Sequence, residues 1–526
     1  MPTNPVKPIS GPLQTRKPWR SHLVVFPSFA QFFRSNSVRL ASLVGQLAFW
    51  AVLSLASVPS ANAQPLKVRI KVSSVAPARL RIEIDLPSAT NALSFRNTYA
   101  GVVGLGERIE AHAAINEKGE SITVQRLAPG EFKSRENFSR FSYDVNVTEP
   151  ARPAQMSHVT WLHPDQGLLM LSDLLPQPTG NSTHLDSALI SVEVPPGWSV
   201  ASNMKGEGSR FSTNDSENGV FLIGASVRET HERVASTDFA IVTAGEWPLS
   251  HKDAIQIAAK ILEEHLRVTR YRLQGDAVLM LVPYPGEAGP ESWSAETRGN
   301  DVVLVLGKKA SRKKVLARLG IVLSHELFHL WIPNSLSLKG DYDWFFEGFT
   351  LYQALRTDLR LGLISFDDYL ETIAGVYDAY RSSVDGDRLS LIEASERRWT
   401  TSSAVVYEKG MLVAFIYDLT LRRLTDCGSS LDDVYRDIFQ LSATGGAGHG
   451  SANETIIRIL GEREGLKSFA REFVESRSAI NLESTLSQYG MQLQPEDPGV
   501  HATRLAVSRE LNQAQRRLLS CIGYKR

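Results

Sequence analysis

A His-Glu-x-x-His pentad, His325 to His329, lies in an apolar-periodic run that begins near Ser311. The apolar residues of this run have the spacing of a helix buried on most sides, namely Val315, Leu316, Leu319, Val322, Leu323, Leu327 and Leu330. In such a helix the two histidines lie one turn apart on one face, close enough to share a metal ion. Buried polar groups without partners are costly, so a ligand is expected to satisfy these side chains. Neutral imidazoles at this spacing indicate zinc.

A catalytic zinc ion typically takes three protein ligands and leaves one position open. Glu347 is the predicted third ligand, because seventeen residues separate it from His329 and Gly348 follows it. A connection of this length lets the first helix end near Ile332 and lets a second helix return alongside it. We therefore expect one Zn2+ ion, bound by His325, His329 and Glu347. The alternative is a chance occurrence of the pentad on an ordinary amphipathic helix.

The composition is that of an ordinary soluble globular protein, with 43% apolar and 22% charged residues. At 526 residues the chain is too long for one hydrophobic core. Its formal net charge is zero, so the overall charge gives no indication of nucleic-acid binding.

The first 63 residues have the pattern of a secretory signal peptide. Residues 1–39 contain basic but no acidic side chains, an uncharged apolar run follows at 40–58, and Ala61-Asn62-Ala63 ends the segment. We expect cleavage after Ala63 and export to the periplasm or the medium. An uncleaved membrane anchor is the alternative, because the apolar run is long.

We expect an α+β multidomain chain, with a signal peptide at 1–63, an N-terminal β domain at 64–245, a thermolysin-like catalytic domain at 246–493 and a C-terminal tail at 494–526. Period-two alternation broken by Pro, Gly, Asn and Asp predicts an antiparallel, sandwich-like β domain, with strands at 68–72, 79–84, 141–147 and 189–194. This domain is expected to serve packing or substrate approach without chemistry of its own.

The predicted catalytic domain has two parts. The first should contain a helix at 250–266, strands at 277–282 and 302–306, and then the pentad helix. The second, after Glu347, is expected to be mainly helical, with one helix beginning at Ser365 through a capping box to Asp368. Such a half would form the far wall of a substrate cleft.

The chain resembles the glycyl aminopeptidase family, gluzincin zinc metallopeptidases related to the aminopeptidase N family. The resemblance rests on residues 325–331, 344–352 and 407–410 and covers most of 68–493. It implies an aminopeptidase that hydrolyses N-terminal peptide bonds. Members of this family often carry a PDZ domain near the C-terminus, and we expect none here.

The resemblance also implies roles by position. His325, His329 and Glu347 match the metal ligands, and Glu326 matches the general base. Glu326 stands next to a ligand but off the ligand edge, where it can take a proton from water and pass it to a leaving amine. Tyr407 matches the tyrosine that supports the oxyanion, an interaction worth a few kcal/mol. Without the resemblance, Tyr407 would be interpreted as a core tyrosine.

Glu296 lies where the family has a glycine-rich motif whose glutamate binds the free amino group of the substrate. The glycines of that motif are missing around Glu296, and Thr297 replaces the usual histidine. As a loop residue, Glu296 could equally be a solvated charge. If it does not bind an ammonium group, the cleft would accept internal peptide bonds and the enzyme would be an endopeptidase.

Other interpretations remain. A catalytically inactive binding protein with the gluzincin fold is the main alternative to an enzyme. A peptide is the expected partner, membrane contact is expected only through an uncleaved signal segment, and the oligomeric state is left open. Asp341 and Asp343 are candidates for orienting the two ligand histidines. Pairing of Cys427 with Cys521 is undecided, and the lone histidines His251, His265 and His449 are expected at the surface or with satisfied rings.

Overall fold

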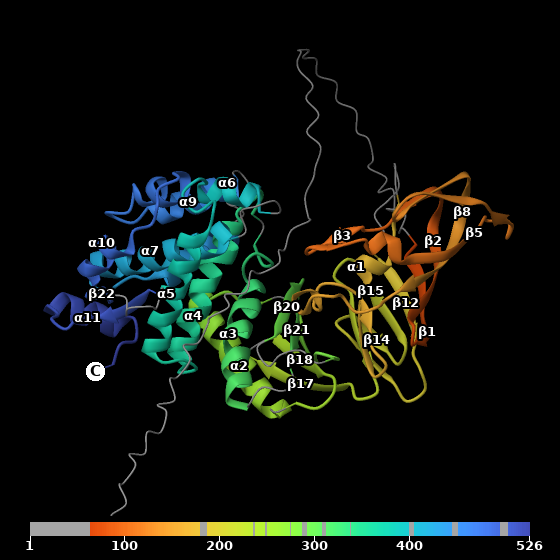
Figure 1. Cartoon of the computed structure of the whole chain (residues 1–526), viewed down its shortest axis with the longest axis horizontal. Helices are drawn as coiled ribbons and strands as arrows, with labels where there is room; N and C mark the ends of the chain where they lie inside the picture. The colour runs from red at the N-terminus through yellow and green to blue at the C-terminus, as the bar shows by residue number, and fades with distance from the viewer. Residues whose placement is uncertain are drawn as a thin grey trace, which may run out of the picture.

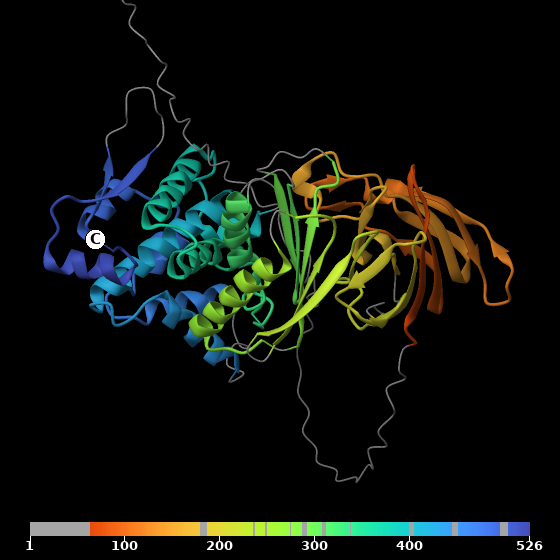
Figure 2. The ribbon, with the colours of Figure 1, turned by 90° about the horizontal axis from the view of Figure 1, so that it is seen from below.

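The computed structural model describes residues 64–178, 187–234, 237–247, 250–273, 275–286, 292–307, 312–336, 338–398, 404–443, 451–494 and 503–525. The predicted signal peptide lies outside these residues. A β domain stands at one end of the molecule and a helical half at the other, with a third sheet between them (Figures 1 and 2). Among the described helices, none combines the length and the apolar composition that crossing a bilayer requires.

The β domain is a sandwich of two sheets, which confirms the sequence-based prediction. Within the described residues the larger sheet has the order β14-β15-β12-β1-β2-β8-β5-β6, with β11 beside β2 and β7 beside β8. Its strands are β1 (Leu66–Val75), β2 (Ala78–Ser94), β5 (Ile109–Ile115), β6 (Ser121–Ile122), β7 (Val124–Ala128), β8 (Glu131–Asn146), β11 (Gln177–Pro178), β12 (Ala188–Glu193), β14 (Lys205–Glu207) and β15 (Arg210–Thr213). The described pairs are antiparallel, apart from β1 with β12.

The smaller sheet has the order β13-β16-β10-β9, and its central strands β16 and β10 are buried on both faces. Its strands are β9 (Trp161–Leu162), β10 (Gln166–Met170), β13 (Ser199–Ser202) and β16 (Val220–Gly224). Leu169, Phe221 and Ile223 pack against the larger sheet. Leu168 and Leu222 point the other way, to the third sheet. Because side chains alternate along a strand, this one sheet contributes to two hydrophobic cores.

The third sheet has the order β17-β18-β19-β21-β20. Its strands are β17 (Arg228–Val234), β18 (Thr237–Thr243), β19 (Ala277–Pro283), β20 (Trp293–Arg298) and β21 (Asp301–Leu306). Helix α2 (His251–Thr269) connects β18 to β19, which run parallel. The predicted boundary at 245/246 falls inside this sheet, because β17 and β18 precede it, β17 pairs with β18, and β18 pairs with β19.

The far face of the third sheet is covered by α2 and by α3 (Arg312–His329), the pentad helix. The helices that follow are α4 (Thr350–Leu361), α5 (Phe366–Ser382), α6 (Leu391–Glu396), α7 (Gly410–Leu424), α8 (Leu431–Ala443), α9 (Ala452–Gly461), α10 (Leu482–Leu486) and α11 (Gln513–Cys521), with π-helical turns η3 (Trp344–Phe349), η4 (Val405–Lys409) and η6 (Arg471–Glu475). The predicted capping box of Ser365 with Asp368 begins α5.

The segment expected to be a C-terminal tail packs on the helical half. Strand β23 (Arg504–Val507) pairs with β22 (Met491–Gln494), and Leu518 and Leu519 of α11 are buried in the same core as α3. Cys427 and Cys521 form a disulfide, which settles the pairing left open by the sequence.

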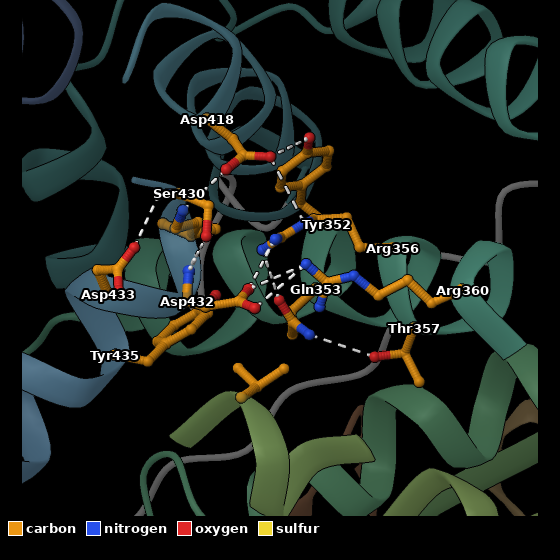
Figure 3. Close-up of polar contacts among 12 residues, drawn as sticks. Tyr352, Gln353, Arg356, Thr357, Arg360, Asp418, Ser430, Asp432, Asp433 and Tyr435 are labelled. Carbon is orange, nitrogen blue, oxygen red and sulfur yellow. Dashed lines mark hydrogen bonds and ion pairs between the residues drawn. The ribbon is translucent and has the colours of Figure 1, made fainter. Parts of the chain in front are cut away.

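A buried charge network ties α4 to α7 and α8 (Figure 3). Arg356 of α4 donates to Asp432 of α8 at 2.6 Å and to Gln353 at 2.8 Å. Tyr352 of α4 donates to Asp418 of α7 at 3.1 Å. Buried charges are tolerated only when they are paired and hydrogen-bonded, so this network fixes the helix that directly follows the turn η3.

Candidate metal centre

Helix α3 brings His325 and His329 together on one buried face. Their Nε2 atoms are 3.0 Å apart. Nδ1 of His329 donates to the carbonyl oxygen of Ile332 at 2.9 Å. Because a carbonyl only accepts, this bond places the ring proton on Nδ1 and leaves the Nε2 lone pair for a ligand.

Glu347 completes a triangle with the two rings. Its Oε2 atom lies 3.4 Å from His325 Nε2 and 3.5 Å from His329 Nε2. Ligand atoms around a tetrahedral zinc ion, with bonds of about 2.0–2.1 Å, lie about 3.3 Å from one another. Oε2 is buried without a hydrogen-bond partner, and these three residues are the one metal-ligand group found among the described residues. The donor set and its spacing fit a zinc ion.

The charge states of His325 and Glu347 suit a cation, while the neighbouring carboxylate of Glu347 raises the pKa of His329 against the effect of burial. Burial, with His329 nearby, lowers the pKa of His325 to about 4, so its ring is neutral. Burial alone would raise the pKa of Glu347, but Arg398 and His329 outweigh it and hold that pKa well below its usual value. The site therefore presents a neutral ring and a carboxylate at neutral pH, as zinc ligation requires.

Glu326 is turned from the ligand edge towards strand β20. Thr297 of that strand donates its hydroxyl to Glu326 Oε2 at 2.7 Å. Burial raises the pKa of Glu326 to about 7, with the carboxylates of Glu347 and Glu296 adding to the rise. A carboxyl group with a pKa near neutrality can both take up and release a proton, as a general base must.

Two glycines place Tyr407 beside Glu347. Glu347 lies in the π-helical turn η3 and Tyr407 in the turn η4, and such turns are frequent at functional sites. A Cβ atom on Gly348 would stand 2.5 Å from the Cα atom of Gly410, so the two turns pack backbone against backbone. Burial raises the pKa of Tyr407 well above its ordinary value, and the hydroxyl keeps its proton at neutral pH.

Arg398, which the sequence reasoning missed, links these residues. Its Nη2 atom donates to Glu347 Oε1 at 2.7 Å and to the Tyr407 hydroxyl at 2.5 Å, and its Nη1 atom donates to Asp343. The guanidinium is fully buried. Asp343 therefore holds Arg398, whereas the sequence had suggested it as a partner of the ligand histidines. No spacing rule signals an arginine fifty-one positions after the carboxylate that it binds.

Glu296 is not a solvated loop residue, as the sequence had suggested it could be. It lies in β20 with its side chain buried. Tyr99 donates its hydroxyl to Glu296 Oε1 at 2.5 Å, His158 Nδ1 lies 2.6 Å from Oε2, and Arg298 Nη2 lies 3.0 Å from Oε1. Both carboxylate oxygens are engaged by groups of the chain itself. Recognition of a substrate ammonium by Glu296 stays a prediction.

Tyr99, in β3 (Thr98–Tyr99), and His158 come from the β domain. They lie 197 and 138 positions before Glu296, so nothing local in the sequence could have paired them. The β domain was expected to contribute packing or substrate approach only. It also supplies two polar side chains to the strand that flanks Glu326.

The lone histidines differ from one another. His251 is bonded to the hydroxyls of Thr243 and Thr230, as expected of a satisfied ring. His265 was expected to be satisfied or exposed, and this is wrong. It is buried in α2 against Phe328 and Trp331, and neither ring nitrogen has a hydrogen-bond partner. His449 lies outside the described residues.

No protein-family model and no curated protein sequence matches the chain. Among solved structures, an aminopeptidase N family protein from Idiomarina loihiensis aligns with 82% of this chain and 79% of its own length, at a TM-score of 0.68 and 18% identity. An M1 zinc metallopeptidase from Deinococcus radiodurans aligns with 80% of this chain and 95% of its own length, at a TM-score of 0.48 and 13% identity. The chain therefore has the fold of the Idiomarina aminopeptidase N family protein.

Proposed function

We propose that this protein is a zinc-dependent metallopeptidase of the aminopeptidase N type. The observation that carries the proposal is the triangle of His325 Nε2, His329 Nε2 and Glu347 Oε2. Beside it stands Glu326, a carboxyl group that can exchange protons at neutral pH. The fold shared with an aminopeptidase N family protein supports the same conclusion.

The residues divide the chemistry between them. A zinc ion held by the triangle would polarise a peptide carbonyl and lower the pKa of a water molecule. Glu326, oriented by Thr297, would take the proton of that water and deliver it to the leaving amine. Tyr407 would donate its hydroxyl to the carbonyl oxygen as negative charge develops there.

The decisive experiment compares the purified protein with a Glu326→Gln variant. We expect both to contain zinc and the variant to hydrolyse a peptide substrate on the order of 10²–10⁴-fold more slowly, the usual contribution of a general base. If both proteins hold zinc and neither hydrolyses peptides, the inactive binding protein replaces the enzyme. Equal activity in the two would exclude Glu326 as the base.

The aminopeptidase specificity is the finer part of the proposal, and one observation favours an endopeptidase instead. Tyr99, His158 and Arg298 already satisfy the carboxylate of Glu296, which was expected to bind the amino group. The two specificities are separated by the turnover of a free peptide and of the same peptide acetylated at its N-terminus. Faster turnover of the free peptide supports the aminopeptidase, and equal rates support the endopeptidase.

We also propose that the protein is exported. The basic start, the apolar run and Ala61-Asn62-Ala63 support this, and a disulfide between Cys427 and Cys521 is compatible with an oxidising compartment. N-terminal sequencing of the protein from the periplasm or the medium should find Gln64 as the first residue. A cytoplasmic protein that retains residues 1–63 would contradict export.

A further inference from the structure

We propose that Arg398 is a positioning residue that restricts Glu347 to one metal-binding oxygen and couples this ligand to Tyr407. The inference rests on the proposed function. The observation behind it is a single buried nitrogen, Nη2, that donates both to Glu347 Oε1 at 2.7 Å and to the Tyr407 hydroxyl at 2.5 Å. Arg398 thus contacts a metal ligand and the predicted oxyanion donor at once.

The first consequence concerns the two oxygens of Glu347. Oε1 is occupied by the guanidinium, while Oε2 faces both histidine Nε2 atoms and has no hydrogen-bond partner. A free glutamate can bind a metal through either oxygen or both. With Oε1 engaged, only Oε2 is left, so the chain would offer three protein atoms to a zinc ion, the number typical of a catalytic site.

The second consequence concerns the direction of the guanidinium. Asp343 accepts from Nη1, so the planar group is held at a second nitrogen as well as at Nη2. A planar fork held at two points has a defined orientation, which a flexible ammonium group lacks. The guanidinium is also the cation that both buried carboxylates, those of Glu347 and Asp343, share. Removing the cation would leave two carboxylates buried close to each other.

The third consequence concerns Tyr407. Its oxygen accepts from Arg398, so the position of the hydroxyl depends on the same group that sets the orientation of Glu347. A shift of the guanidinium would displace the metal ligand and the oxyanion donor together. Loss of metal affinity and loss of turnover should therefore occur in one variant.

The test uses Arg398→Lys in the full-length protein, because lysine keeps the positive charge but lacks the planar fork. We expect zinc affinity, measured by competition with a chelator, to fall about 10- to 100-fold, the usual cost of losing an orienting partner of a metal ligand. In the cobalt-substituted protein the visible d–d bands should weaken, as they do when a second carboxylate oxygen raises the coordination number. Unchanged zinc affinity and an unchanged cobalt spectrum would overturn the inference.

Kinetics tests the coupling to Tyr407. We expect Arg398→Lys to lower kcat about 10-fold or more while KM changes little, since an oxyanion donor acts in the transition state. The double variant with Tyr407→Phe should lose less than the product of the two single losses. Losses that multiply would exclude the coupling. Arg397→Lys, at the exposed neighbouring arginine, is the matched control and should behave as the wild type.

Two further results keep the outcomes distinct. If Arg398→Lys does not fold, Asp343→Asn replaces it, because this variant keeps Arg398 and weakens only its contact with Asp343. A loss of zinc affinity and of kcat that is smaller than expected for Arg398→Lys supports the inference. Unchanged zinc affinity and kcat overturn it. A wild-type protein without zinc or activity would instead refute the proposed function. A wild type with both, whose Arg398→Lys variant is indistinguishable from it, refutes only the role of Arg398.

Discussion

Substitution of Gly348 by alanine should separate the two turns that carry Glu347 and Tyr407. The added Cβ atom would stand 2.5 Å from the Cα atom and 2.6 Å from the carbonyl carbon of Gly410. Ordinary contact begins at 3.4 Å, so the backbones must move apart by about 0.9 Å. Backbone atoms cannot rotate away as the tip of a side chain can, and the displacement passes directly to the neighbouring site residues.

The expected effect on rate is large and the effect on stability is small. A displacement of about 1 Å in a catalytic group costs on the order of 10²-fold in rate. Overpacking destabilises by about 1–3 kcal/mol, but alanine recovers about 1 kcal/mol relative to glycine within a helix. We therefore expect the free energy of unfolding to fall by no more than about 2 kcal/mol, while kcat falls about 100-fold.

The assay combines peptide hydrolysis with urea unfolding for Gly348→Ala and for a matched control. Gly320→Ala on α3 is that control, because its added Cβ would meet only the tip of Leu363, at 3.0 Å, which can move. The control should keep the wild-type kcat. If Gly348→Ala retains wild-type kcat, or loses activity only as much as it loses folded protein, close packing of the two turns is not what positions Glu347 and Tyr407.

Two further outcomes follow from buried contacts. Thr297→Val should lower kcat about 10-fold or more, because it removes the hydrogen bond to Glu326 while keeping the shape of the side chain. Thr297→Ser keeps the hydroxyl and should have the wild-type kcat. Equal rates in the two variants would exclude this role of Thr297. Burial lowers the pKa of His265 from 6.5 to about 3. Below pH 6.5 the unfolded chain therefore binds a proton that the folded chain does not. The free energy of unfolding should fall as the pH falls through this range. Between pH 8 and pH 5 the free energy of unfolding, measured with urea, should fall by about 2 kcal/mol more in the wild type than in His265→Leu. An equal fall in the two proteins would contradict the burial of a neutral ring.

Local patterns were enough to predict many of the elements and the three side chains of the candidate metal centre. Alternation in residues such as Ile82 and Ile84 predicts strands because one face of each strand is buried, and the spacing of His325 and His329 predicts a shared helix face. Glu347 could be identified because a connection of seventeen residues lets the next helical segment return beside the pentad helix, and its distances to both rings agree with that placement.

Contacts between distant segments could not be predicted from one sequence. His158 reaches Glu296 only because the β domain packs against β20, and Arg398 reaches Glu347 only because the segment after α6 lies against η3. The domain boundary placed at 245/246 shows the same limit. Strands β17 and β18 follow the β domain directly in the sequence, and the parallel pairing of β18 with β19 joins them to the third sheet.

Zinc stoichiometry, determined by elemental analysis of the folded protein after dialysis, tests the metal centre most directly. The geometry predicts one zinc ion per chain in the wild type and almost none in His329→Ala or Glu347→Ala. A wild-type protein that stays metal-free after incubation with zinc, or variants that bind as much zinc as the wild type, would contradict a metal centre built from His325, His329 and Glu347.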